Sequence, residues 1–125
     1  RDKLVTGVQT CALPICRSGK QNAFTDEDIE KYKEAWSQPG AVTAMLNWYR
    51  AAWRYRPEIT NDMRVAVRTL ILWGVKDFAL SRRMARPSLD YCDDGRLIFF
   101  PDATHWIQRE EADDVNRHLL EFVLT

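Results

Sequence analysis

The sequence predicts an α/β fold built on a parallel sheet, and two observations carry this prediction. Two strand-length apolar runs, residues 67–74 (VRTLILWG) and 96–100 (RLIFF), are continuous rather than alternating, which is typical of strands covered on both faces. Each run is followed by a stretch in which apolar residues recur at helical spacing. The order strand, helix, strand, helix indicates a parallel sheet.

The composition excludes several classes of protein. The 125 residues include 18 basic and 18 acidic side chains, so no bulk positive charge recruits nucleic acid or an anionic membrane. No apolar run approaches the roughly 18 residues of a membrane span. Cys11, Cys16 and Cys92 have neither the spacing of a disulfide scaffold nor that of zinc ligands. We therefore expect a cytoplasmic globular protein with no metal and no cofactor.

The first sixteen residues differ in character from the rest. Residues 5–15, VTGVQTCALPI, resemble the conceptual translation of a common sequencing-library adapter. The segment lacks the long apolar centre of a signal peptide, so we do not expect it to direct export. We interpret residues 1–16 as an assembly artefact. The alternative is a genuine short strand and turn, and resequencing the locus distinguishes the two.

Residues 26–37 are expected to form the first helix. Thr25 and Asp28, three residues apart, have the pattern of a capping box at its start. Pro39 and Gly40 then break the helical spacing, which predicts the end of the helix just before them.

A second helix is expected over residues 41–54, because apolar side chains recur there every three or four residues. The stripe consists of Val42, Met45, Leu46, Tyr49 and Trp53. Tyr49 is therefore expected to face a buried surface. Residues 55–66 lose this periodicity and contain a proline, so they are expected to form a connecting loop.

The second half of the chain follows the strand and helix order. Gly74 ends the first strand, and a helical stretch is expected from about Ala79, interrupted at Pro87. After the second strand, residues 110–124 are expected to form the last helix, with acidic residues at its N-terminal end, where the helix dipole favours them. The sequence contains no internal repeat.

Two polar residues follow the two predicted strands. In open parallel sheets, functional groups collect in the loops beyond the carboxyl ends of the strands. Asp77 follows the first strand and His105 the second, so a right-handed crossover would bring their loops together. A carboxylate beside an imidazole fixes its tautomer and stabilises the cation that forms when the imidazole accepts a proton. His105 is the candidate base and Asp77 the candidate orienting acid.

Plainer interpretations of these residues remain open. His105 could be a loop histidine bonded to nearby backbone, and Asp77 an ordinary turn residue. Asp102 is a rival acid near His105, although a turn-forming role is commoner for such a residue. His118 is expected on the solvated face of the last helix.

Three segments resemble a known family. The segments TLILWGVKDFALS (residues 69–81) and LIFFPDATHWIQREEADDVN (residues 97–116) resemble the last two core strands of α/β hydrolases, in which the catalytic acid follows one strand and the histidine the next. AMLNWYRAAWR, residues 44–54, resembles the second half of the helical cap of epoxide hydrolases. The resemblance covers residues 22–123.

The resemblance implies a division of the chain. Residues 57–125 would be the C-terminal part of an α/β-hydrolase core, with its last two parallel strands and flanking helices, and residues 17–56 a partial helical cap. In the epoxide hydrolase family the nucleophile is an aspartate on a sharp turn after an earlier strand. This sequence has neither such a turn nor an oxyanion-hole motif, and it lacks one of the family's two cap tyrosines. These elements are expected upstream.

The resemblance also implies a reaction for the complete protein. The missing aspartate would attack a ring carbon of a small, apolar, epoxide-like substrate, while Tyr49 hydrogen-bonds the ring oxygen. His105, held by Asp77, would then activate water to hydrolyse the covalent ester and release a diol. Because the nucleophile is absent, we expect the chain alone to be inactive. Because its two strands would lack their neighbours in a larger sheet, we also expect it to be insoluble or loosely folded. The sequence does not indicate an oligomeric state.

Alternatives within and outside this chemistry stay open. The fold also serves haloacid or haloalkane dehalogenases and serine esterases, and a non-catalytic ligand-binding relative is a third possibility. The missing nucleophile would separate them. Three tryptophans are candidates for a substrate pocket, although tryptophan at helical spacing is more often packing: Trp106, Trp48 and Trp36.

Overall fold

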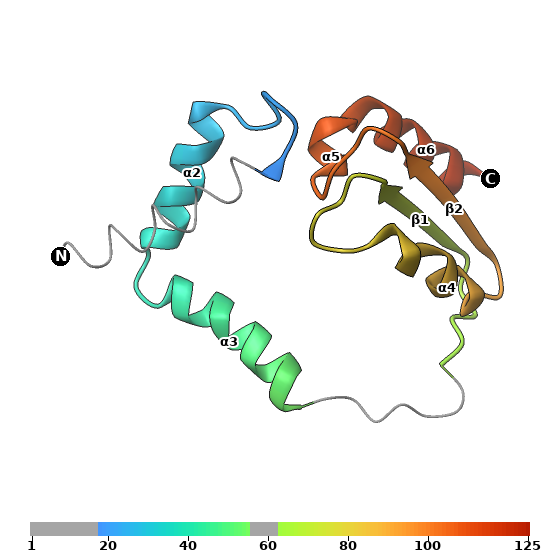
Figure 1. The fold of residues 1–125 in the computed structure, drawn as a ribbon, viewed down its shortest axis with the longest axis horizontal. Helices are drawn as coiled ribbons and strands as arrows, with labels where there is room; N and C mark the ends of the chain where they lie inside the picture. Colours follow the sequence, from blue (N-terminus) through green and yellow to red (C-terminus); the bar gives the residue numbers. More distant parts are fainter. Residues whose placement is uncertain (1–17, 56–62) are drawn as a thin grey trace. The chain divides into compact units, whose positions relative to one another are not determined.

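The computed structural model describes residues 18–55 and 63–125, which fall into two compact units (Figure 1). Residues 24–55 belong to the first unit, and residues 18–23 and 63–125 belong to the second. The expectations for residues 1–16 and for most of the 55–66 loop lie outside the described residues. The assignment of the two units to a cap and a core stays a prediction.

The first unit contains two helices with the predicted ends. Helix α2 spans Asp26–Ser37 and α3 spans Ala41–Arg54. The capping box is confirmed: the Thr25 hydroxyl accepts from the Asp28 N–H at 3.1 Å, and the Asp28 carboxylate accepts from the Thr25 N–H at 3.0 Å. Gly40 has a φ of 81°, a left-handed conformation that favours glycine, and this turn separates the helices.

The core of the first unit is small and centres on Trp36. Its ring stacks on Tyr32 with centroids 5.4 Å apart, and Val42 from the start of α3 packs against it. The rest of the α3 stripe is exposed, and Tyr49 is 68% exposed. The prediction that Tyr49 faces a buried surface is therefore wrong in this unit, because α2 covers the stripe only at its first turn.

The second unit contains the predicted parallel sheet. Strand β1, Thr69–Gly74, pairs with β2, Gly95–Phe100, in parallel (Figure 1). The register places Thr69 opposite Gly95 and Gly74 opposite Phe100. Both strands thus end at the same edge of the sheet.

The crossover between the strands differs from the prediction. A 3₁₀ turn, η1, spans Arg82–Met84 and leads into α4, Ala85–Asp90. Pro87 does not interrupt the helix but is its third residue. In the first turn of a helix a proline is tolerated, because the N–H that it lacks would have no partner within the helix.

The last predicted helix begins two residues later than expected, and a separate short helix precedes it. Helix α5 spans Ile107–Glu110 and α6 spans Ala112–Leu124, and Glu111 separates them with a non-helical φ of −132° and ψ of 42°. Helix α6 contributes Val115 to the core of this unit. The core residues are Phe100, Ala103 and Val115, with Leu72, Ile98 and Ile107 packed around them.

His118 is not on a solvated face, contrary to the prediction. Its side chain is 15% exposed, and its ring meets the Phe100 ring edge to face at 5.9 Å. The imidazole therefore packs against the sheet as part of the α6 contact.

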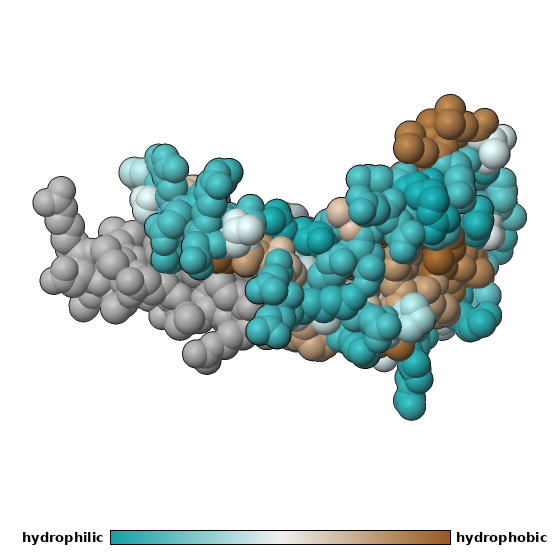
Figure 2. Space-filling model, turned by 90° about the horizontal axis from the view of Figure 1, so that it is seen from above, coloured by the Kyte–Doolittle hydropathy of each residue, from teal (hydrophilic) through white to brown (hydrophobic). Residues whose placement is uncertain are grey.

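Apolar side chains remain on the surface of the sheet unit. Figure 2 shows brown, apolar atoms among the hydrophilic ones in the half of the view that holds the sheet. The large apolar residues of α6 that are exposed are Leu119, Leu120, Val123 and Leu124. Among the described residues, no helix is long and apolar enough to cross a membrane.

Candidate active site

The loops that follow β1 and β2 are joined through their backbones. The Val75 N–H donates to the Phe100 carbonyl at 3.0 Å, and the Lys76 N–H donates to the Ala103 carbonyl at 2.9 Å. Hydrogen bonding between the two segments thus continues past the ends of the strands. This pairing holds the residues that follow, Asp77 in one loop and His105 in the other, next to each other.

Gly74 allows the loops to approach this closely. A Cβ atom added at Gly74 would lie only 2.7 Å from the carbonyl oxygen of Ala103 and would also collide with the carbonyl of Thr104. Because backbone atoms cannot move aside as the end of a flexible side chain can, a glycine is required here. The sequence indicated Gly74 only as the end of a strand.

Asp77 and His105 form the predicted pair. His105 Nδ1 lies 3.0 Å from Asp77 Oδ2. The other carboxylate oxygen, Oδ1, accepts from the backbone N–H groups of Ala79 and Leu80 at 2.8 and 2.9 Å. The Asp77 side chain is 9% exposed and that of His105 is 36% exposed, so the acid is buried while the imidazole reaches the surface.

The electrostatics of the pair keep the acid ionised. Burial acts to raise the pKa of Asp77, but hydrogen bonds from backbone N–H groups and from His105 outweigh it, and the pKa lies below its ordinary value of 3.8. An ionised carboxylate accepts a hydrogen bond from the Nδ1–H of His105. In this tautomer the Nε2 lone pair is free to take a proton. This arrangement is that of a general base with its orienting acid.

The space beside the pair is mainly apolar. The rings of Phe78 and Trp106 meet the His105 ring edge to face, at centroid distances of 5.8 and 5.4 Å. A cavity of about 160 Å³ adjoins Asp77 and His105. Its apolar lining is formed by Leu72, Trp73, Leu80 and Ile107. Such a lining excludes water and favours an apolar ligand.

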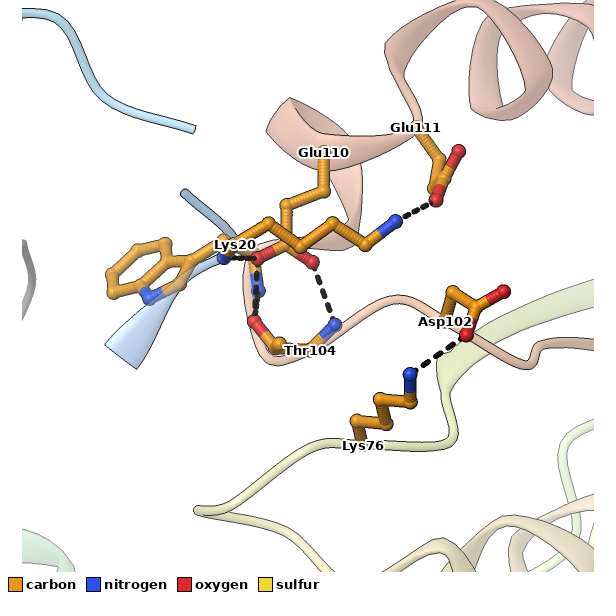
Figure 3. Close-up of polar contacts among 7 residues, drawn as sticks. Lys20, Lys76, Asp102, Thr104, Glu110 and Glu111 are labelled. Carbon is orange, nitrogen blue, oxygen red and sulfur yellow. Dashed lines mark hydrogen bonds and ion pairs between the residues drawn. The ribbon is translucent and has the colours of Figure 1, made fainter. Parts of the chain in front are cut away.

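Asp102 does not compete with Asp77 for the histidine. Its carboxylate accepts from Lys76 Nζ at 2.7 Å and so links the two loops at the surface (Figure 3). The hydrogen bond from Lys76 and the positive charge of that side chain lower the pKa of Asp102. Of the two acids considered from the sequence, only Asp77 contacts His105.

The other predicted site residues lie in different surroundings. In the first unit, Tyr49 meets the ring of Trp48 edge to face at 5.1 Å, and both side chains are exposed. Trp36 is buried in the packing core of that unit. In the second unit, Trp106 follows His105 directly, and its Nε1–H donates to the Ser18 hydroxyl at 2.8 Å.

A partly buried acid network supports the histidine loop and was not predicted from the sequence. Glu110 accepts from the backbone N–H and the hydroxyl of Thr104, both at 2.6 Å, and from the backbone N–H of Lys20 at 2.7 Å (Figure 3). The Lys20 ammonium forms an ion pair with Glu111. In the sequence, the acidic pair 110–111 has the pattern of a charged helix start. Its contacts with Lys20, which is distant in the sequence, show that it anchors the loop.

Within residues 18–55 and 63–125, no group of three His, Cys, Asp or Glu side chains could hold a metal ion. Cys92 is a free, half-buried thiol.

Comparison with known sequences identifies similar hydrolases. No family model matches the chain. It is 43% identical over 106 residues to the AB hydrolase superfamily protein YfhM of Bacillus subtilis, and 34% identical over 110 residues to epoxide hydrolase 2 of Caenorhabditis elegans. Human epoxide hydrolase 4 is 36% identical over 110 residues. These matches cover 85 to 87% of this chain but only 29 to 37% of the relatives, so the chain spans about a third of their length.

Solved structures of hydrolases superpose on this chain. The epoxide hydrolase of Bacillus megaterium superposes with a TM-score of 0.76 over 96% of this chain and 44% of that protein, at 20% identity. An epoxide hydrolase found in metagenomes from hot environments superposes with a TM-score of 0.73 at 22% identity, and a serine hydrolase of carbazole degradation with 0.72 at 18% identity.

Proposed function

Because this chain has the fold of the C-terminal part of an α/β hydrolase and is similar to epoxide hydrolases over most of its length, we propose that it supplies the water-activating half of an epoxide-opening site. The observation that carries the proposal is the contact of His105 Nδ1 with Asp77 Oδ2 at 3.0 Å. The substrate class is a small apolar epoxide, in keeping with the apolar cavity beside the pair.

The proposed reaction has two steps. An aspartate outside this chain attacks a carbon of the three-membered ring, the carbon–oxygen bond breaks, and the ring oxygen takes up a proton. Tyr49 is the proposed donor to that oxygen, since a phenolic O–H is a hydrogen-bond donor. The product of this step is an ester between the aspartate and the substrate.

His105 acts in the second step. Its Nε2 takes a proton from water, and the hydroxide attacks the carbonyl carbon of the ester. The ester breaks, the aspartate is regenerated, and a vicinal diol leaves, while the imidazolium gives up its proton and the Tyr49 phenolate regains one by exchange with water, so that both side chains return to their starting forms. Asp77 stabilises the imidazolium while it exists. This role requires an ionised Asp77, and the lowered pKa of Asp77 supports it.

The test separates the two steps in the full-length protein, read from the uninterrupted natural reading frame. With styrene oxide, His105→Ala is expected to form the ester without turning it over, so that mass spectrometry detects a protein adduct and diol release falls by at least about a hundredfold. Tyr49→Phe is expected to slow adduct formation instead.

Asp102→Asn is the matched control for Asp77→Asn, because both remove a carboxylate near His105 and only Asp77 contacts it. Asp77→Asn should lower diol release strongly, and Asp102→Asn should leave it within about twofold, since exposed ion pairs contribute little. Equal effects of the two variants, or hydrolysis of esters with no reaction of epoxides, would overturn the proposal. The second outcome would favour a serine esterase of the same fold.

A further inference from the structure

The Glu110 carboxylate contacts the loop that carries His105. It accepts three hydrogen bonds: Oε2 from the Thr104 N–H, and Oε1 from the Thr104 hydroxyl and the Lys20 N–H (Figure 3). Thr104 immediately precedes His105, so two of the three bonds fix the residue next to the candidate base. Glu110 itself does not contact the imidazole.

A helix dipole does not account for this placement. Glu110 is the last residue of the four-residue α5, where the dipole disfavours a negative charge. The first turn of α6 has acidic residues of its own, Asp113 and Asp114. The oxygens of Glu110 instead point to Thr104 and Lys20, which lie 6 and 90 positions away in the sequence.

The chemistry of the contact requires a carboxylate. Both oxygens of Glu110 face donors, and an amide of the same shape would have to turn its NH₂ group toward at least one N–H. Burial acts to raise the pKa of Glu110, but the hydrogen bonds from Thr104 and Lys20 outweigh it, and the pKa is lower than its ordinary value of 4.5. The group is therefore ionised at neutral pH, and its bonds are charge-assisted.

The histidine loop is held by hydrogen bonds at Ala103, Thr104 and Trp106. The Ala103 carbonyl accepts from the Lys76 N–H, Thr104 binds Glu110, and the indole of Trp106 donates to Ser18. Of these contacts, those of Glu110 are the ones made by an ionised group. Since displacement of a reacting group by about 1 Å can cost on the order of a hundredfold in rate, such an anchor has a direct effect on turnover.

We propose that Glu110 is a positioning residue for His105: through Thr104 it fixes the loop so that the imidazole keeps its contact with Asp77. The inference rests on the proposed function, because it assigns the base role to His105. It adds a residue that acts through the backbone and touches neither the substrate nor the reacting atoms.

The test compares Glu110→Gln with Glu111→Gln in the same full-length protein. The two glutamates are adjacent, but among the described residues the Glu111 side chain pairs with the Lys20 ammonium and not with the loop. Glu110→Gln is expected to lower kcat by between about tenfold and about a hundredfold with KM nearly unchanged, and Glu111→Gln to leave both within about twofold. Thr104→Ser keeps both donors to Glu110 and should retain nearly normal kcat. Thr104→Val loses the hydroxyl and should have a lower kcat.

A second measurement does not depend on turnover. Hydrogen exchange of the Thr104 amide should speed up in Glu110→Gln and not in Glu111→Gln, and the ring NMR signals of His105 should shift only in the first. These results would support positioning even if the wild-type protein opens no epoxide, in which case only the proposed function fails. If both variants exchange alike and leave the His105 signals in place, the positioning role is refuted, whatever the activity. A Glu110→Gln protein that loses kcat only in proportion to its unfolded fraction would refute it as well.

Discussion

At the scale of single residues, the site depends on two carboxylates that keep their charge although they are partly buried. Asp77 holds the imidazole and Glu110 holds the loop, and both have a pKa below the ordinary value because hydrogen-bond donors surround them. An acid whose pKa is lower in the folded than in the unfolded state stabilises the fold above its unfolded pKa and loses this effect as the pH falls through the folded value.

The pH dependence of stability follows from this sign. We expect the contribution of these two acids to the free energy of unfolding to be fully present and constant above about pH 5, and to decline as the pH falls below their ordinary pKa values of 3.8 for Asp77 and 4.5 for Glu110. Urea unfolding between pH 7 and pH 3 measures this decline, which should be shallower in Glu110→Gln. A wild-type protein that gains stability on acidification would contradict it.

At the scale of elements, the end of β1 sets the position of the histidine loop. In Gly74→Ala the new methyl group meets the Ala103 and Thr104 carbonyls, so the loop has to move away. We expect a loss of stability of about 1 to 3 kcal/mol and a shift of the His105 ring signals, because the contact with Asp77 lengthens. Chemical denaturation and NMR measure the two effects.

Gly40→Ala is the matched control for this change. Nothing lies within 4 Å of an added Cβ at Gly40, but its φ of 81° strains any other residue. This variant should lose about 1 kcal/mol and leave the His105 signals unchanged. Similar NMR shifts in both variants would mean that the effect of Gly74→Ala is not local to the loop.

The elements show which features the sequence can predict. Helices α2 and α3 have the predicted ends, because capping and helix-breaking residues act locally. The meeting of Asp77 and His105 was also predicted and is confirmed, since parallel strands must end at one edge. The catalytic roles stay predictions.

Features that depend on contacts distant in the sequence were not predicted. Glu110 fits both a helix start and a loop anchor, and only its contacts with Thr104 and Lys20 decide between them. The environments of Tyr49 and His118 were predicted wrongly, because periodicity marks a face of a helix but does not say what covers it.

At the scale of the whole molecule, the chain presents much apolar surface for its size. The sheet of the second unit has two strands, and two-stranded sheets are marginally stable in water. Val67, Val123 and Leu124 are 70, 77 and 81% exposed. Covering a large apolar side chain contributes about 1.5 to 3 kcal/mol, against about 5 to 15 kcal/mol for a whole domain.

We therefore expect the isolated chain to be loosely packed. It should bind the dye anilinonaphthalene sulfonate, keep its far-ultraviolet circular dichroism, and unfold over a broad range of urea concentration. The matched comparison is the full-length protein, which should bind little dye and unfold sharply. Sharp unfolding of the isolated chain without dye binding would contradict this expectation.

The backbone bond from Lys76 to Ala103 has a consequence for the segment that joins the strands. The spacing of acid and base is set where the two loops meet and not by the length of the connection between them. Insertions or deletions around α4 should therefore alter the outer surface of the protein and leave the separation of Asp77 and His105 unchanged. A natural variant with a longer crossover would be an independent example of this tolerance.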